Sequence, residues 1–275
     1  MSANELFDEE TKQALKEIFQ QFQRKIVDYL VVEEGSESAS DPDPDPDPID
    51  PPDDPSEDEN KQTATPIQPH PHVHHHGCPT CGEAKMLAKA LMEVSDGKLE
   101  FKIIDKNSEE AKQLHVRYVP AFIYGSQKKN IRYYGLPSGQ EFAPFIYIHS
   151  YIANNEVKLP ENVIEEAKKI DAPLHIKIFV TPECPYCPLT VDGFNQLALI
   201  NDKLLVETIE AVELPLEADM YNVAYVPDVV ITDPDKMDEY GVEPIERING
   251  YMPIEETINI VKYAAEKLKE TKKQG

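Results

Sequence analysis

The sequence predicts an α/β protein in which one βαβαββα unit occurs twice in tandem. Two Cys-x-x-Cys pairs, CPTC and CPYC, each lie a nearly constant distance ahead of a Tyr-Val-Pro phrase. Cys78 precedes Pro120 by 42 residues, and Cys184 precedes Pro227 by 43. An apolar run follows each of these prolines. Equal spacing between two distinctive phrases indicates an internal repeat.

Two further landmarks support the repeat and set its limits. The strand predicted after each apolar run ends in Arg-x-x-Gly, at 132–135 and at 247–250, and a proline then opens the last helix of each copy. Agreement at four landmarks is hard to obtain by chance. The domains predicted from it are a first unit over 1–155 and a second over 156–275, each a central mixed sheet flanked by helices.

In the first unit, apolar residues at i, i+3, i+4 and i+7 predict a helix over 5–24. The apolar run 25–32 then predicts a buried strand. The remaining predicted elements are a helix after CPTC, a strand at 98–105, a short helix capped by Asn107 or Ser108, strands in YVPAFIYG and NIRYYG, and a helix over 137–152.

The second unit repeats this order. Alternating apolar residues predict a strand at 174–181, which stops three residues before Cys184. The remaining predicted elements are a helix after CPYC, a strand at 204–214, a helix at 217–223, strands in VPDVVIT and PIERING, and a final helix with Ile254, Ile258, Val261, Ala265 and Leu268 on one face.

An acidic, proline-rich insertion interrupts the first unit over 34–69. From Glu33 to Asn60 there are 13 Asp or Glu residues and no Lys or Arg, and the run includes DPDPDPDP. Alternating prolines remove backbone donors and like charges repel, so a disordered, solvated segment is expected. We interpret it as a solvated insertion, with a tether or docking strip as the alternative.

The overall charge excludes some partners. The chain has 51 acidic and 27 basic residues, a formal net charge of −24, and it keeps 38 acids against 27 bases when Glu33–Asn60 is left out. This balance argues against nucleic acid and anionic membranes as partners. The N-terminus has acids where a signal peptide needs bases, and no 18-residue apolar run occurs, so a cytoplasmic protein is expected.

The four cysteines fall entirely within the two Cys-x-x-Cys pairs. Without an export signal, this pattern favours redox catalysis or metal binding over a structural disulfide framework. A cysteine at a helix start lies beside free N–H groups and the positive end of the helix dipole, which favours its thiolate. The alternative for either pair is half of a zinc site, but one four-thiolate site would have to join both units.

The repeated unit, with Cys-x-x-Cys after its first strand and Val-Pro before its third, resembles the thioredoxin fold. Two such units in tandem, with RYYGLPSGQEF in the first and FVTPECPYCP in the second, resemble the protein disulfide oxidoreductases of thermophilic archaea and bacteria, which are also described as glutaredoxin-like. The resemblance covers 1–33 and 77–275. It implies one continuous sheet and thiol–disulfide exchange at both pairs.

The resemblance also implies roles for single residues. Cys78 and Cys184 correspond to attacking cysteines and Cys81 and Cys187 to resolving ones, while Pro120 and Pro227 correspond to cis-prolines that face them. The backbone ahead of a cis-proline is expected to pair with a substrate strand. CPYC is typical of glutaredoxins, but the Thr-Val-Pro and Gly-Gly features that bind glutathione are not intact, so protein thiols are the expected substrates.

Five histidines precede the first pair in HPHVHHHGCPTC. Of these, His74, His75 and His76 are candidate ligands for a divalent metal, regulatory or adventitious, together with Cys78. Alternatively the tract supplies only nearby positive charge that acidifies the thiol. The isolated His115, His149 and His175 are expected at the surface or at helix caps.

The leading hypothesis is therefore a protein disulfide oxidoreductase with two active sites that needs no cofactor beyond its redox-active disulfides. Its expected partners are client proteins with thiols or disulfides, and an NADPH-dependent flavoprotein of the thioredoxin-reductase kind that recycles it. Two alternatives remain: a metal-handling protein that uses the histidine tract with CPTC, and a thioredoxin-fold scaffold that holds a partner.

Overall fold

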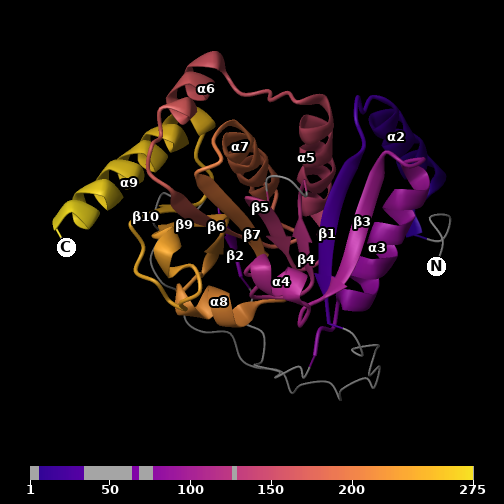
Figure 1. The fold of residues 1–275 in the computed structure, drawn as a ribbon, viewed down its shortest axis with the longest axis horizontal. Helices are drawn as coiled ribbons and strands as arrows, with labels where there is room; N and C mark the ends of the chain where they lie inside the picture. Colours follow the sequence, from indigo (N-terminus) through magenta and orange to yellow (C-terminus); the bar gives the residue numbers. More distant parts are fainter. Residues whose placement is uncertain (1–5, 34–63, 68–76, 126–128, 275) are drawn as a thin grey trace.

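The structure is a computed structural model that describes residues 6–33, 64–67, 77–125 and 129–274 (Figure 1). The first half contains α2 (Glu9–Gln20), β1 (Ile26–Val32), β2 (Thr65–Pro66), α3 (Cys81–Val94), β3 (Leu99–Asp105), α4 (Glu109–Gln113), β4 (Ala121–Ile123), β5 (Ile131–Tyr134), η2 (Gly139–Glu141) and α5 (Phe142–Asn154). The second half contains α6 (Glu161–Lys168), β6 (Leu174–Val180), α7 (Cys187–Ile200), β7 (Leu204–Glu210), α8 (Pro215–Met220), β8 (Tyr225–Val226), β9 (Asp228–Thr232), η3 (Pro234–Lys236), β10 (Glu246–Asn249) and α9 (Ile254–Gln274).

One eight-stranded mixed sheet passes through both halves in the order β10-β9-β6-β7-β5-β4-β1-β3. In the first half β1 is parallel to β3 and antiparallel to β4. In the second half β6 is likewise parallel to β7 and antiparallel to β9. The halves join where β5 runs parallel to β7, with Tyr133 level with Thr208. The predicted repeat and its continuous sheet are confirmed.

Most predicted elements occur, with differences at their ends. The first helix begins at Glu9, because the Asp8 side chain accepts the Thr11 N–H at 2.7 Å and caps it. The predicted Ser108 cap is present and accepts the Ala111 N–H. The strand expected over 204–214 stops at Glu210, whose carboxylate accepts the N–H groups of Val212 and Glu213 and turns the chain. Helix α6 was not predicted.

The structure departs from the expected solvated insertion at Ala64–Ile67. Most of 34–69 lies outside the described residues, but Thr65–Pro66 forms β2 and pairs antiparallel with β8. Ile67 is partly buried against the hydrophobic core. The segment is extended as expected, yet its backbone is bonded to protein rather than only to water. Figure 1 shows violet β2 among the elements of the second half.

A buried charged cluster joins the two halves around Glu207 of β7. Its carboxylate lies 2.6 Å from His175 Nε2, 3.3 Å from an Arg117 nitrogen and 3.5 Å from an Arg132 nitrogen. Lys177 pairs with Glu217 beside it. All of these side chains are almost completely buried. Both arginines belong to the first half, so the charges of each half balance those of the other.

The expectation that His149 and His175 lie at the surface or at caps is wrong. Both are fully buried. His149 Nε2 lies 2.7 Å from Asp28 Oδ2, and His175 belongs to the cluster around Glu207. A buried polar ring needs such a partner, and each of these partners is distant in the sequence. His115 is about half exposed, as expected.

The described helices include none with the length and apolar character needed to cross a membrane.

Candidate active sites

The second Cys-x-x-Cys pair lies between the end of β6 and the start of α7. Cys184 and Cys187 form a disulfide with Cα atoms 5.5 Å apart. The Cys187 N–H donates to Cys184 Sγ at 3.1 Å, and no side chain caps the helix. Donors at a helix N-terminus favour a thiolate at the sulfur they face. The geometry therefore suits Cys184 as the acidified cysteine of this pair.

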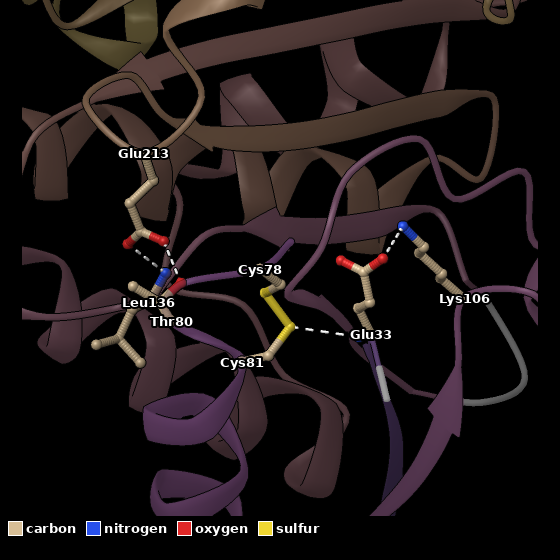
Figure 2. The surroundings of a disulfide bond; sticks show 7 residues. All are labelled: Glu33, Cys78, Thr80, Cys81, Lys106, Leu136 and Glu213. Carbon is tan, nitrogen blue, oxygen red and sulfur yellow. Dashed lines mark hydrogen bonds and ion pairs between the residues drawn. A yellow bond between two sulfur atoms is a disulfide. The ribbon is translucent and has the colours of Figure 1, made fainter. Parts of the chain in front are cut away.

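The first pair occupies the equivalent position, but here the Cys81 N–H donates to the Cys78 carbonyl oxygen at 3.4 Å and not to its sulfur. Cys78 and Cys81 form a disulfide with the same Cα separation of 5.5 Å, and α3 begins at Cys81 without a side-chain cap. The Glu33 N–H donates to Cys81 Sγ at 3.4 Å (Figure 2). Because Glu33 directly follows β1, the chain returns after the insertion to the end of the strand that it left. The insertion does not displace the first site.

Strand register places each predicted proline beside its cysteine pair. Both Val119–Pro120 and Val226–Pro227 are cis peptides. Ala121 is level with Val31, so Pro120 lies opposite the end of β1. Asp228 is level with Phe179, so Pro227 lies opposite the end of β6. Both pairs and both prolines thus come together at one edge of the sheet.

All four cysteines are nearly inaccessible in the disulfide form. Cys78 and Cys81 are 2% and 1% exposed, and Cys184 and Cys187 are both 0% exposed. A mechanism of thiol exchange requires access to the attacking sulfur. The sites are therefore closed in this state, and what lies beside each of them governs access.

The second half contributes a side chain to the first site. Glu213 accepts the Thr80 hydroxyl at 2.5 Å and the Leu136 N–H at 2.8 Å, and Thr80 lies between the two cysteines of CPTC (Figure 2). Glu210 holds the backbone of this loop by accepting the Glu213 N–H at 2.6 Å. Burial raises the pKa of Glu213, and also raises that of Glu210 to about 7.

The first half of the chain likewise contributes a contact to the second site. The Gln140 N–H donates to the Pro182 carbonyl at 2.8 Å, and Pro182 lies in the loop that leads to Cys184. Gly139 has φ +55°, and a Cβ there would clash with the same carbonyl oxygen. Only glycine permits this approach. Each active-site loop thus rests on the other half of the chain.

The two sites differ in the residues at their strand ends. Lys106 and Ala211 donate backbone N–H groups to equivalent positions of β1 and β6. Glu33 therefore corresponds to Thr181, and Lys106 to Ala211. Only the first site has the ion pair between Glu33 and Lys106, at 2.5 Å (Figure 2). This charge pair distinguishes the surroundings of Cys81 from those of Cys187.

A cavity of about 460 Å³ flanks α7 of the second site. Leu189, Thr190, Tyr251 and Met252 are among its lining residues, and Tyr251 stacks on Tyr186 of CPYC with ring centroids 5.8 Å apart. The lining is mixed apolar and polar. The cavity thus lies along the helix that begins at Cys187.

The candidate metal ligands His74, His75 and His76 lie outside the described residues. Within the described ranges, no group of three or more His, Cys, Asp or Glu side chains is arranged to hold a metal ion. Metal binding by the tract stays a prediction.

Sequence reasoning did not identify Glu33, Glu210 or Glu213 as neighbours of the first site. Glu33 could have been identified from the sequence, because it directly follows the strand that leads to the first site. Glu213 could not, because its contact with Thr80 depends on how the two halves of the chain pack together.

The thioredoxin domain family matches residues 174–248, from the start of β6 into β10. Among curated proteins, the alkyl hydroperoxide reductase AhpF of Staphylococcus aureus is 22% identical over an alignment of 198 positions, which covers 64% of this chain and 36% of that protein. NADH dehydrogenase of Bacillus subtilis is 24% identical over 101 residues, which make up 37% of this chain and 20% of that protein. The chain thus spans about a third of the length of the staphylococcal relative.

Two solved structures match almost the whole chain. The protein disulfide oxidoreductase of Aeropyrum pernix superimposes with a TM-score of 0.69 at 22% identity, over 94% of each chain. The alkylhydroperoxide reductase AhpF of Enterococcus faecalis superimposes with a TM-score of 0.67 at 17% identity, over 92% of this chain and 98% of that one. The fold is that of two thioredoxin-like units in tandem, as the sequence predicted.

A buried carboxyl group near the junction predicts how stability depends on pH. Glu141 is fully buried, and no described residue hydrogen-bonds to its carboxylate oxygens. Burial, aided by Glu210, raises the pKa of Glu141 to about 8 from an ordinary value of 4.5. Between these values the folded protein holds a proton that the unfolded chain releases. The free energy of unfolding should therefore fall as pH rises through this window, by up to about 1.4 kcal/mol per pH unit from this group.

Glu141→Gln is expected to flatten that slope and to stabilise the protein above pH 8. Urea denaturation at intervals from pH 5 to pH 9 measures it, with the exposed Glu161→Gln as the matched control. Identical slopes in Glu141→Gln and wild type would show that Glu141 is ionised in the folded state.

Proposed function

We propose that the chain is a protein disulfide oxidoreductase with two active sites, at Cys78/Cys81 and Cys184/Cys187. The observation that carries the proposal is the presence of two equivalent disulfides, each closed between a strand end and an uncapped helix start, with a proline opposite. The match to the disulfide oxidoreductase of Aeropyrum pernix supports it. We keep 1–155 and 156–275 as the units that carry one site each.

The reaction transfers two electrons between a dithiol and a disulfide. In the reducing direction, the thiolate of Cys184 attacks one sulfur of a client disulfide, and the client's other sulfur leaves as a thiolate that takes a proton. Cys187, once deprotonated, then attacks Cys184 in the mixed disulfide. The client leaves as a dithiol and the site becomes the disulfide observed here. Cys78 and Cys81 act in the same order.

Three features support protein clients over small thiols. The closed disulfides are almost inaccessible, so a partner that binds beside them is favoured because it is held next to the sulfur atoms. The backbone ahead of Pro227 accepts an extended strand, as its pairing with β2 demonstrates. A cavity beside α7 has room for a side chain. A peptide chain makes use of all three.

An external reductant must return each site to the dithiol. We propose an NADPH-dependent flavoprotein reductase for this step. The match to the staphylococcal alkyl hydroperoxide reductase AhpF favours a second candidate function, in which the chain passes electrons within a peroxide-reducing system. The metal-handling and scaffold hypotheses predict no catalytic turnover. Reduction of insulin by dithiothreitol, with metal analysis of the purified protein, separates these functions from the proposed one, and a peroxide-coupled assay tests the second candidate.

Replacing a resolving cysteine is expected to trap clients. In Cys187→Ser the mixed disulfide at Cys184 has no internal thiol to resolve it, so covalent complexes with protein disulfides should accumulate. Cys81→Ser should do the same through Cys78. Non-reducing electrophoresis and mass spectrometry of the linked cysteine measure the result. In matched variants that also carry Cys184→Ser or Cys78→Ser, the corresponding adduct should disappear. Adducts on the wrong cysteine would reverse the assigned roles.

A further inference from the structure

The strand position beside the second site is occupied by the protein's own chain. Thr65 is level with Val226, and Pro66 with Tyr225, in antiparallel pairing. The Ile67 N–H donates to the Ala224 carbonyl at 3.0 Å. Three consecutive residues from the end of the acidic insertion thus lie along the backbone of 224–226.

This backbone runs directly into the second site. Pro227 follows it and lies opposite Val180, at the end of β6. The next residue, Thr181, accepts the Cys184 N–H at 3.2 Å through its carbonyl oxygen. An extended client that pairs with 224–226 would therefore lie beside Cys184, in the place that β2 now takes. The two cannot pair with the same backbone edge at once.

The contact is small enough to exchange. Only two residues pair in the ladder, and a two-stranded pairing of this length is marginal by itself. Pro66 and Tyr225 remain exposed, while Ile67 is partly buried against the core. The tether compensates for the small contact, because an attached segment acts at an effective concentration on the order of 1 mM.

The chain between β2 and Cys78 is long enough for Thr65–Ile67 to be either paired with β8 or released from it. Four strand spacings separate β1 from β6, roughly 19 Å in all. The ten residues from Ile67 to Gly77 reach up to about 35 Å when extended. Thr65–Ile67 can therefore leave β8 without any demand on the position of Cys78.

We propose that Thr65–Ile67 is an internal competitor for the client strand at the second site. The inference rests on the proposed function of that site. While the segment is paired, it excludes extended protein clients, and small disulfides that need no strand pairing escape the competition. The second site thus favours clients that bind the 224–226 backbone better than the tethered segment does.

The test uses the full chain with Cys78→Ser and Cys81→Ser, so that only the second site reacts. In this background Thr65-Pro66-Ile67 is changed to Gly-Ser-Gly, and the matched control changes Pro51-Pro52-Asp53 of the same insertion to Gly-Ser-Gly. Insulin and a small aliphatic disulfide are the substrates, with dithiothreitol as reductant. Circular dichroism melting establishes that each variant is folded.

A competitor changes KM and leaves kcat alone. The KM for insulin is expected to fall at least five-fold in the Thr65–Ile67 variant, with kcat within two-fold and with small-disulfide turnover unchanged. The control variant should match its parent. A free peptide of residues 62–69 should restore the high KM in the Thr65–Ile67 variant, and a scrambled peptide should not. The single change Ile67→Pro, which removes the N–H that bonds to Ala224, should lower KM in the same direction.

An unchanged KM for insulin in both folded variants would overturn the proposal. An equal change in the control variant would also overturn it, by assigning the effect to the insertion as a whole. Loss of turnover on both substrates in the parent background would instead contradict the proposed function of the second site.

Discussion

Replacing Cys78 and Cys184 together by serine is expected to lower dithiothreitol-driven reduction of a small disulfide by roughly 100-fold or more, to the uncatalysed rate. Each site has a single attacking thiolate, and serine is no nucleophile toward sulfur. Either single variant should keep the turnover of the remaining site. A small disulfide is the right substrate, because its access does not depend on β2. The rate of disulfide reduction in each variant is measured from the thiol released in samples quenched at fixed times.

The matched control is the double variant Cys81→Ser/Cys187→Ser, which keeps both attacking cysteines but no resolving one. Each of its sites should react once with a client and then stall, whereas Cys78→Ser/Cys184→Ser should not react at all. Residual multiple turnover in Cys78→Ser/Cys184→Ser would mean that a resolving cysteine also attacks substrate.

Glu207→Gln is expected to lower the free energy of unfolding by about 3–5 kcal/mol, because it leaves buried arginines without their shared carboxylate. Burial alone would raise the pKa of Glu207, but His175, Arg132 and Arg117 outweigh it and hold the pKa well below its ordinary value. Glu207 thus contributes stability that is present above the unfolded-state pKa and is lost as pH falls through the folded-state one. Urea denaturation at pH 7 measures the loss.

The matched control is Glu100→Gln, which breaks the exposed pair with Lys25. Surface pairs contribute little, so its denaturation midpoint should equal that of wild type within error. A similar midpoint in both variants would show that Glu207 does not stabilise the junction. A shift confined to one half, detected by two separate transitions, would show that the halves unfold independently.

The parts of the fold that the sequence predicted are those set by local patterns. Apolar runs located β1 and β6, the two Cys-x-x-Cys pairs located the starts of α3 and α7, and the Tyr-Val-Pro phrases located β4 and β9. The sites followed from these, because strand order and register bring Pro120 and Pro227 to the same edge as the cysteines.

The features that escaped prediction depend on contacts between distant segments. His175 and Lys177 alternate with apolar residues in β6, a pattern that indicates an exposed face, yet both are buried. Their partners Glu207 and Glu217 lie more than 30 residues away. Thr65–Ile67 sits in an acidic, proline-rich segment with no strand pattern, and only the free backbone edge at β8 gives it a partner. Composition cannot reveal such an edge.

The joint between β5 and β7 has a consequence for association between molecules. β5 and β7 are the counterparts, in their own units, of β10 and β3, which form the two outer edges of the sheet. The same head-to-tail joint, made between β10 of one molecule and β3 of the next, would add molecule to molecule and would build a fibre wherever the rotation between molecules did not close a ring. Charged side chains occur on both edges: Glu100 and Lys102 on β3, and Glu246 and Arg247 on β10. Charges on edge strands oppose such pairing between molecules.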